Sequence, residues 1–271
     1  MDIIYSQGEE GQVFEALVNF IAEENLCDNL DLQKIVSTSP TIELLKKYAR
    51  KKNYYYFTGD NFEVPYIMLT GNMDTFFQTL SSSMRYKIKR NSKKIIKFND
   101  FIFHNTENSL ELERDFTELV RLHQMRWESR NQSGAFSDKK FFCFQKSAME
   151  KMLENGTLKL SFLSVSGRNI ASQYNISYKD KLYFYQGGID ASFYRNLSPG
   201  YLMHAYCIGE AIKNGLKEYD FLVADKENTY KKHWAKDCRY MMDVNIACRR
   251  SYKLYLWVMD RVKLRGIRDK A

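Results

Sequence analysis

Apolar residues recur with helical spacing in several stretches of the first half of the chain. A spacing of three to four residues places side chains on one face of a helix, so these stretches predict amphipathic helices. Three sets show it: Phe14, Leu17, Val18 and Ile21; Leu80, Met84, Ile88 and Ile95; and, over residues 108–130, Leu112, Phe116, Leu119, Val120, His123 and Trp127.

The second half of the chain changes to strand patterns. Apolar positions alternate over residues 158–165, 170–178 and 182–186, which predicts three antiparallel strands joined by tight turns. Pro199 is expected to open a helix that ends near Gly215, and two more strands are expected beyond it, over 219–223 and 240–247. This order predicts an α/β (α+β) protein with a mixed, mostly antiparallel central sheet and helices on both faces.

Residues 1–64 form a segment of their own in this pattern. They include expected strands at 3–5, 30–32 and 54–57 beside the first helix. A segment of this length is too short to bury a core alone, so we expect it to pack on the rest of the chain. We predict a division into residues 1–64 and residues 65–271, the second part ending in a basic helix over 251–268.

Composition supports a globular protein without a metal centre. Of 271 residues, 44% are hydrophobic and 27% are charged, which is enough for a substantial core. The five cysteines are scattered without CxxC spacing, and the four histidines show no ligand spacing, so a disulfide framework or a zinc site is not expected. The chain has neither a run of about 18 apolar residues nor a signal-like start, so we expect a cytoplasmic protein.

Positive charge is concentrated in two runs within a net charge of +8. Residues 85–97 hold seven basic side chains and no acidic one, and residues 249–271 carry a net charge of +6. Such runs indicate an anionic partner: a phosphorylated cofactor, an acyl carrier protein, nucleic acid or a membrane surface, including the inner face of the cell membrane. The alternative is a solvated helix face.

The stretch from Tyr183 to Leu202 carries the clearest chemical signal. A strand ends at Gly187-Gly188, a loop crosses, and a helix starts at Pro199-Gly200. Free backbone N–H groups at a helix start attract anions, and a glycine there lets a diphosphate approach the backbone. Arg195 could add a charge-assisted hydrogen bond. The alternative is a plain turn in which Ser198 caps the helix.

Over residues 65–250 the sequence resembles a family of acetyltransferase-like proteins associated with bacterial cellulose and exopolysaccharide biosynthesis. That family belongs to the GNAT superfamily and is related to the Fem-type aminoacyl transferases of peptidoglycan bridges. The resemblance rests on the order and spacing of several short pieces: Pro65-Tyr66-Ile67; Met84-Arg85 with Arg90; Leu122-His123 with Arg126-Trp127; Gly134 and Phe136; Gly167, Ile170-Ala171 and Tyr174; Gly187; Ser198-Pro199-Gly200; Ala211-Ile212 with Gly215; Tyr219-Asp220-Phe221-Leu222; and Tyr230-Lys231 with Trp234.

The resemblance implies the GNAT acyl-CoA N-acyltransferase fold with acyl-CoA, first of all acetyl-CoA, as co-substrate. Arg195-x-x-Ser198-x-Gly200 stands where GNAT enzymes have the loop that binds the CoA diphosphate, with Ser198 in place of its first glycine. In such folds the preceding strand separates from its neighbour and lends backbone groups to the pantetheine. The implied cofactor-binding residues are Tyr185, Gln186, Gly187, Arg195, Ser198, Pro199, Gly200 and Tyr201.

Acyl transfer to an amine needs a neutral amine, a polarised thioester carbonyl and a proton for the leaving thiolate. By resemblance Tyr230 would supply that proton, unless it is an ordinary packed aromatic. Asp190, Asp220 and Asp225 are the candidate bases, acting directly or through water. Each of these acids could instead be a structural hydrogen-bonding group in a strand end or a loop.

Residues one helical turn apart suggest an acceptor pocket. His123 and Trp127 are neighbours at i and i+4, and Arg126 projects beside them, where it could hold an anionic group. Packing of His123 and Trp127 in the core is the alternative. The predicted substrate-binding residues are Arg85, His123, Arg126, Trp127, Gln173 and Lys231.

Three functions remain open from the sequence. The first is N-acylation of an amine by acyl-CoA, with an amino sugar or a nucleotide-linked sugar of an envelope polysaccharide as acceptor. The second is Fem-type transfer from aminoacyl-tRNA. The basic run at 85–97 favours it, whereas the sequence lacks the coiled-coil arm that Fem-type proteins often carry, which speaks against it. The third is a non-catalytic scaffold on a membrane surface, held by the amphipathic helix 251–268. The resemblance also implies that residues 1–64 are part of a first GNAT-like half.

Overall fold

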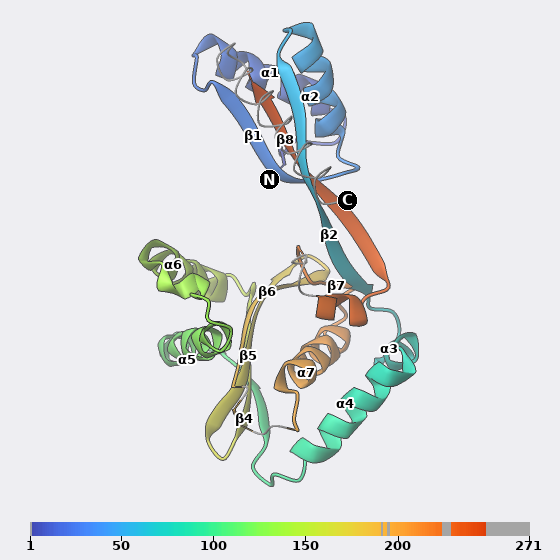
Figure 1. Cartoon of the computed structure of the whole chain (residues 1–271), viewed down its shortest axis with the longest axis vertical. Coiled ribbons are helices and arrows are strands. Elements are labelled where there is room, and N and C mark those ends of the chain that lie inside the picture. Colours follow the sequence, from blue (N-terminus) through green and yellow to red (C-terminus); the bar gives the residue numbers. More distant parts are fainter. Residues whose placement is uncertain (1, 191, 194–195, 224–228, 248–271) are drawn as a thin grey trace. The chain divides into compact units, whose positions relative to one another are not determined.

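The computed structural model describes residues 2–190, 192–193, 196–223 and 229–247. Within these ranges the chain forms two compact units (Figure 1). Unit 1 consists of the residues up to Val64 and of the C-terminal strand β8 (Asp237–Ala247) from Cys238 onward, and unit 2 consists of residues 65–237. Arg195, Asp225 and the expected helix 251–268 lie outside the described residues.

Unit 1 packs two helices on a small sheet. Its elements are α1 (Glu10–Glu23), β1 (Asn29–Val36), α2 (Pro40–Lys51), the first part of β2 (Tyr55–Met68) and β8. Phe14 and Val18 of the predicted stripe are buried here beside Leu45, Val244 and Ile246. The expected strand at residues 3–5 does not form.

The structure corrects the predicted C-terminal boundary of the second domain. The sequence assigned residues 65–271 to one domain, whereas β8 belongs to unit 1. The reason is strand pairing: β8 runs antiparallel to β1, with Asn29 opposite Ala247 and Leu32 opposite Val244. Local sequence patterns cannot show that the last strand returns to the first one.

Unit 2 contains the larger part of the sheet. The strand order of the whole sheet is β1-β8-β2-β7-β6-β5-β4-β3. The strands of this part are β3 (Ile102–Asn105), β4 (Leu158–Val165), β5 (Arg168–Tyr178), β6 (Lys181–Ile189) and β7 (Glu218–Asp220), with the end of β2 beside β7. β6 and β7 are parallel, and the other pairs described here are antiparallel, as the alternating pattern predicts.

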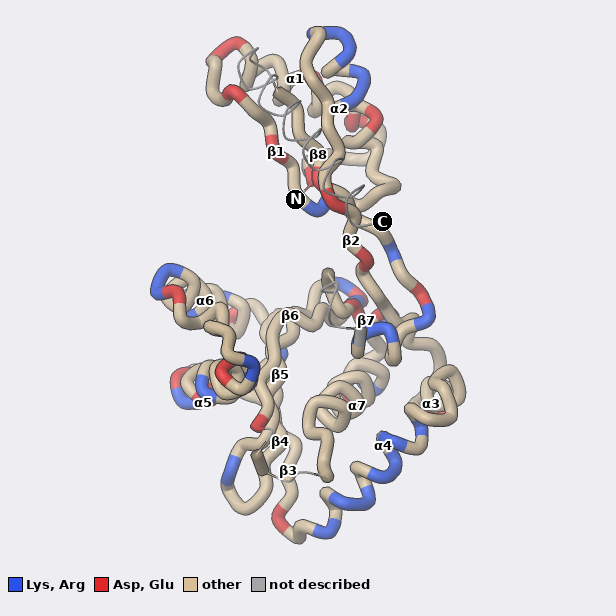
Figure 2. Tube along the Cα trace, in the orientation of Figure 1, with Lys and Arg blue, Asp and Glu red and all other residues tan. Residues whose placement is uncertain are grey.

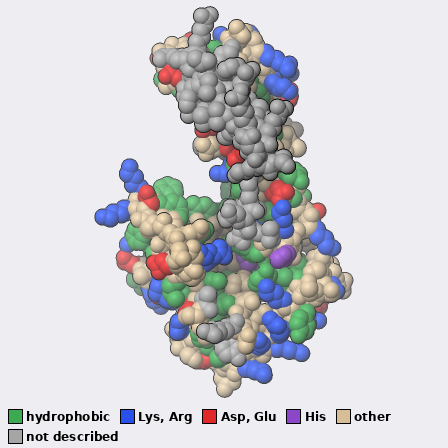
Figure 3. All heavy atoms as spheres, in the orientation of Figure 1, with side chains coloured by type: hydrophobic (Ala, Val, Ile, Leu, Met, Phe, Trp, Pro, Cys, Tyr) green, Lys and Arg blue, Asp and Glu red, His purple; other side chains and the backbone are tan. Residues whose placement is uncertain are grey.

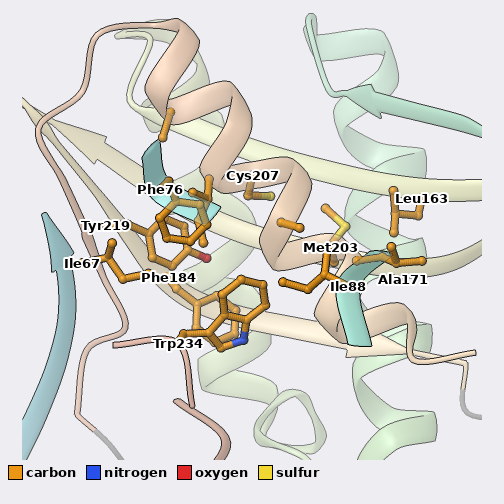
Figure 4. Close-up of a cluster of buried hydrophobic side chains, with 14 of the residues drawn as sticks. Ile67, Phe76, Ile88, Leu163, Ala171, Phe184, Met203, Cys207, Tyr219 and Trp234 are labelled. Atoms are coloured by element: carbon orange, nitrogen blue, oxygen red, sulfur yellow. The ribbon is translucent and has the colours of Figure 1, made fainter. Parts of the chain in front are cut away.

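Helices cover both faces of the unit 2 sheet (Figure 1). Helices α3 (Met73–Thr79), α4 (Ser82–Ile95) and α7 (Pro199–Lys213) lie on one face, and their apolar side chains build the largest core cluster (Figure 4). Helices α5 (Ser109–Glu128) and α6 (Lys139–Glu154) cover the other face with a second cluster. Two short 3₁₀ helices complete the unit, η1 (Ala135–Ser137) and η2 (Thr229–His233).

Side-chain caps fix where the helices of unit 2 begin. Asn72, Ser81, Asn108 and Asp138 each accept a hydrogen bond from a backbone N–H group of the following first turn. Such caps satisfy donors that the helix itself leaves unpaired. None of the helices in the described ranges is long and apolar enough to span a bilayer.

Candidate functional site

Strands β6 and β7 separate in the middle of the unit 2 sheet. They pair at Lys181–Glu218, Leu182–Tyr219 and Tyr183–Asp220, where β7 ends, while β6 continues to Ile189. On its other side β6 stays paired with β5, with a bulge where Tyr174 and Asn175 face Gln186 and Phe184. From Phe184 onward, therefore, one edge of β6 has no pairing with β7.

A cavity of about 340 Å³, here called the β6 cavity, opens beside this edge of β6. Its walls come from the ends of β6 and α5, from β5, from the first turns of α7 and from η2. The lining residues are Arg126, Arg130, Ser172, Phe184, Gly187, Gly188, Ile189, Leu197, Ser198, Pro199, Gly200, Tyr201, Met203, His204 and Tyr230. The cavity thus joins Gly187, Ser198, Pro199, Gly200, Tyr201, Arg126 and Tyr230 of the predicted residues.

Two glycines let helix α5 and strand β5 approach the wall of the β6 cavity. A Cβ at Gly188 would contact the backbone nitrogen of His123 and lie 2.5 Å from the Leu122 carbonyl carbon. A Cβ at Gly187 would lie 3.2 Å from the Ser172 carbonyl oxygen. The close packing brings Arg126 to the strand end, where its Nη1 lies 3.4 Å from the Gly187 carbonyl oxygen.

The start of α7 offers fewer free donors than the sequence suggests. Pro199 has no N–H group, and the Ser198 N–H donates to Oδ1 of Asn91 at 2.8 Å. The N–H groups of Tyr201 and Leu202 bond to the Ser198 carbonyl oxygen. Within the described residues this leaves the Gly200 N–H available to a ligand. Ser198 occupies the N-cap position of α7, but its side chain makes no capping hydrogen bond.

Tyr230 and Arg126 meet at the β6 cavity. Burial raises the pKa of Tyr230, while the positive charge of Arg126 and a hydrogen bond with it act in the opposite direction. The net shift is upward, so the phenol keeps its proton at ordinary pH. Tyr230 is therefore a hydroxyl donor beside a fixed positive charge.

His204 is a cavity residue that the sequence did not single out. Its Nδ1 lies 2.9 Å from the hydroxyl of Tyr219, which accepts a hydrogen bond from the side-chain amide of Gln173. That amide also donates to Asn175, which leaves the Tyr219 proton for His204 Nδ1. Burial, aided by the charges of Lys231 and Arg126, lowers the pKa of His204 to about 3, so the imidazole is neutral.

The two described candidate bases do not line the β6 cavity. Asp190 is fully buried and accepts hydrogen bonds from the Ser192 hydroxyl at 2.6 Å and from Arg168. Burial alone would raise its pKa, but these hydrogen bonds lower it overall. Asp220 accepts a hydrogen bond from the backbone N–H of Leu222 at 2.6 Å. Both carboxylates thus have structural partners.

His123 is buried in the core, as the alternative interpretation has it, whereas Trp127 beside it is only half-buried. The Trp127 indole donates to Nε2 of His123 at 2.9 Å, and the His123 ring packs edge-on against Phe136. Burial lowers the pKa of His123, which keeps it neutral. Gln186 hydrogen-bonds to this histidine, and Tyr185 accepts a bond from Gln145 on the same side of the sheet. These four side chains support the wall rather than line the cavity.

The other predicted substrate-binding side chains also have partners elsewhere. Arg85 donates to the carbonyl oxygens of Gln78 and Leu80, which ties α3 to α4. Lys231 donates to the carbonyls of Phe221 and Val223, and Gln173 belongs to the Tyr219 network. No group of three or more His, Cys, Asp or Glu that could hold a metal occurs in the described part of the chain.

Solved structures share this fold. FemX is 12% identical with a TM-score of 0.62, over 87% of this chain and 76% of that chain. The C-terminal domain of a putative lysylphosphatidylglycerol synthetase from Agrobacterium fabrum is 11% identical with a TM-score of 0.60, over 92% and 77%. L-PGS from Bacillus licheniformis is 10% identical with a TM-score of 0.59, over 96% and 80%. At these identities the likeness concerns the fold alone.

The family is established by sequence. No curated protein sequence matches the chain. The family model described as an acetyltransferase (GNAT) domain matches residues 82–232, more than half of the 271 residues. This range contains the whole β6 cavity, from Arg126 to Tyr230. The chain belongs to the GNAT acetyltransferase family, and the matched residues all lie in unit 2.

Proposed function

We propose that the protein transfers an acyl group, first of all acetyl, from acyl-CoA to an amine. One observation carries the proposal: the β6 cavity lies where β6 leaves β7, beside the first turn of α7, and Tyr230 and Arg126 stand in its wall. The amides in the pantetheine arm of acyl-CoA can hydrogen-bond to an open strand edge, and the leaving thiolate needs a proton donor. The cavity provides both.

The residues present fit acyl-CoA. The edge of β6 beyond Tyr183 can hydrogen-bond the amides of a pantetheine arm, as a further strand would. The Gly200 N–H at the positive end of α7 and the guanidinium groups of Arg126 and Arg130 suit a diphosphate. Bound acyl-CoA would supply an activated carbonyl and a thiolate leaving group.

We assign proton donation to Tyr230. Its raised pKa keeps the hydroxyl protonated, and Arg126 stabilises the phenolate that remains when the proton leaves. The neutral imidazole of His204, with its proton on Nε2, adds a hydrogen-bond donor without adding charge. The described cavity residues include no carboxylate, so neither Asp190 nor Asp220 is retained as the base.

The acceptor that we propose is an amino sugar or a nucleotide-linked amino sugar of exopolysaccharide synthesis. The family resemblance over residues 65–250 supports it.

A second candidate uses aminoacyl-tRNA in place of acyl-CoA. The fold likeness to FemX and to the lysylphosphatidylglycerol synthetases favours it, as does the basic helix α4. Lys and Arg recur along α4 (Figure 2), where Lys89, Arg90 and Lys93 are exposed, and Lys97 is exposed just beyond its end. A polyanion could bind such a face, in a strongly salt-dependent manner.

Two measurements test the proposal. Acetyl-CoA at 100 times its Kd should stabilise the fold by about 2.7 kcal/mol, and a rise in melting temperature reports it. Release of free CoA in the presence of amino sugars should fall roughly 100-fold in Tyr230→Phe without weaker CoA binding. An unchanged melting temperature with every acyl-CoA, together with protein-dependent deacylation of aminoacyl-tRNA, would favour the second candidate instead.

A further inference from the structure

A second cavity of unit 2 borders the start of helix α4 and has no role in the proposed chemistry. This α4 cavity has a volume of about 470 Å³. The end of α3, the first turns of α4, Tyr201 of α7 and the end of η2 form its walls. The lining residues are Thr79, Leu80, Ser81, Ser83, Met84, Lys87, Tyr201, Lys232, His233, Trp234, Ala235 and Lys236.

The described residues that line the α4 cavity are rich in basic side chains and include no acidic one. Lys87, Lys232 and Lys236 carry ammonium groups, and His233 lies between the last two in sequence. Neither Lys87 nor Lys236 takes part in the ion pairs of the described residues. On the face of unit 2 drawn in Figure 3, His side chains lie beside Lys and Arg side chains. Like charges converging on a hollow attract an anion.

Two neutral features of the same walls also suit an anion. The first turn of the 14-residue helix α4 lies in the lining, with Ser81 as its cap accepting from the Met84 N–H at 3.3 Å, so the positive end of the helix is at the cavity. The Trp234 indole N–H is buried and has no hydrogen-bond partner in the described ranges. A ligand acceptor that reached this donor would give it the hydrogen bond that it lacks.

Tyr201 stands between the two cavities and lines both. The ammonium of Lys87 lies 3.4 Å from the centre of its ring, and Trp234 stacks on it with the ring centres 5.9 Å apart. Its hydroxyl lies 3.3 Å from Nδ1 of His233. A ligand in the β6 cavity therefore lies one side chain away from the α4 cavity.

We propose that the α4 cavity binds a phosphate-bearing group of a substrate whose reacting end lies in the β6 cavity. The link to substrate rests on the proposed function, whereas anion binding itself does not. The phosphate could come from CoA or from a nucleotide-linked acceptor, because both carry the same group. Lys87 and the α4 terminus would hold it from one side, and Lys236 from the other.

Titration calorimetry of the full chain with inorganic pyrophosphate tests anion binding. In Lys87→Gln/Lys236→Gln we expect affinity to fall roughly tenfold or more, because two charged hydrogen bonds are lost. Lys236→Gln alone should also weaken binding, since Lys236 lines only the α4 cavity. The control Lys93→Gln removes the same charge from an exposed position of α4 and should change affinity less than about twofold.

Three results would overturn the anion site. Pyrophosphate fails to bind the native chain at low salt, the double variant binds it unchanged, or Lys93→Gln weakens binding as much as the double variant. Equal melting temperatures of the variants and the native chain confirm that the comparison concerns folded protein. None of these readouts requires acyl transfer, which the CoA release assay tests separately.

Competition then separates the two sources of the phosphate. Displacement by CoA of the pyrophosphate whose binding depends on Lys236 assigns the α4 cavity to the donor. Displacement by UDP while CoA leaves pyrophosphate bound assigns it to the acceptor. Displacement by neither overturns the link to a substrate.

Discussion

At the scale of residues, glycines that look alike in sequence have different tasks. Gly188 is required by the fold, because any Cβ there would run into the backbone of α5 at Leu122. At Gly200 the nearest atom to an added Cβ is Cγ2 of Ile189 at 3.6 Å, an ordinary contact distance. The folded chain therefore leaves room for a side chain at position 200, and the proposed function accounts for the glycine there by close approach of a ligand to the backbone.

This contrast predicts opposite outcomes for two alanine substitutions. Gly188→Ala should lower the free energy of unfolding by about 1–3 kcal/mol or more, because the added methyl overpacks the wall. Gly200→Ala should leave stability within about 0.5 kcal/mol and weaken CoA binding. For both variants, urea denaturation measures the free energy of unfolding and calorimetry measures the affinity for CoA. Native-like CoA affinity in Gly200→Ala would remove the argument that the ligand approaches the backbone there.

Tyr230 has a predicted pH signature. Burial raises its pKa above the ordinary value of 10, although Arg126 opposes the shift. The hydroxyl is thus protonated below pH 10, and a reaction that needs its proton should lose no rate to Tyr230 ionisation below that pH. A profile of kcat/KM from pH 6 to 10.5 checks this. An alkaline limb below pH 10 that the native enzyme has and Tyr230→Phe lacks would contradict the raised pKa of Tyr230.

At the scale of elements, local periodicity predicted most of unit 2 and hardly any of its side-chain chemistry. The helical stripe ending at Ile95, the three antiparallel strands and the helix opened by Pro199 follow from spacing alone. Partners distant in sequence decided the rest. The Ser198 N–H goes to Asn91, 107 residues earlier, and a lone histidine such as His204 leaves no spacing signal.

Asn91 is predicted to hold the start of α7 to helix α4. Its Oδ1 accepts from the Ser198 N–H at 2.8 Å, and its Nδ2 donates to the Lys87 carbonyl at 2.7 Å. Asn91→Ala leaves a donor unpaired beside the β6 cavity and should cost about 1–3 kcal/mol of unfolding free energy. Lys93→Ala, an exposed neighbour on the same helix, should stay within about 0.5 kcal/mol. Unfolding of both variants in guanidinium chloride measures these changes. Equal losses of unfolding free energy in the two variants would contradict the role of Asn91.

At the scale of the whole molecule, unit 1 is built from both ends of the described chain. Val244 and Ile246 of β8 are almost fully buried in its core beside Val18 and Leu45. The predicted boundary at residue 64 ignored this return because it followed the order of the sequence. Unit 2, by contrast, draws its largest core cluster from residues 67–234.

A shortened chain tests this division. Removal of everything after Asp237 deletes β8, so the remaining residues 2–64 lose both a strand partner and part of their core. We expect a protease to digest this segment quickly, while residues 65–237 stay protected as in the full chain. Mass spectrometry of the limited digest identifies the protected fragment. Equal protection of residues 2–64 in both chains would contradict the pairing of β1 with β8.

Global stability should also fall in acid because of one buried histidine. The pKa of His204 is about 3 in the fold and 6.5 ordinarily, so between these values the unfolded chain binds a proton that the folded chain does not. The free energy of unfolding therefore rises with pH across this window, by up to about 1.4 kcal/mol per pH unit for this group.

His204→Leu removes that contribution and, through the lost bond to Tyr219, adds an offset that does not depend on pH. All other groups remain in both proteins, so the difference between their stability curves, measured by urea unfolding from pH 4 to 8, isolates His204. We expect the difference to slope below pH 6.5 and to be flat above it, and a flat difference throughout would mean that folding does not shift the pKa of His204.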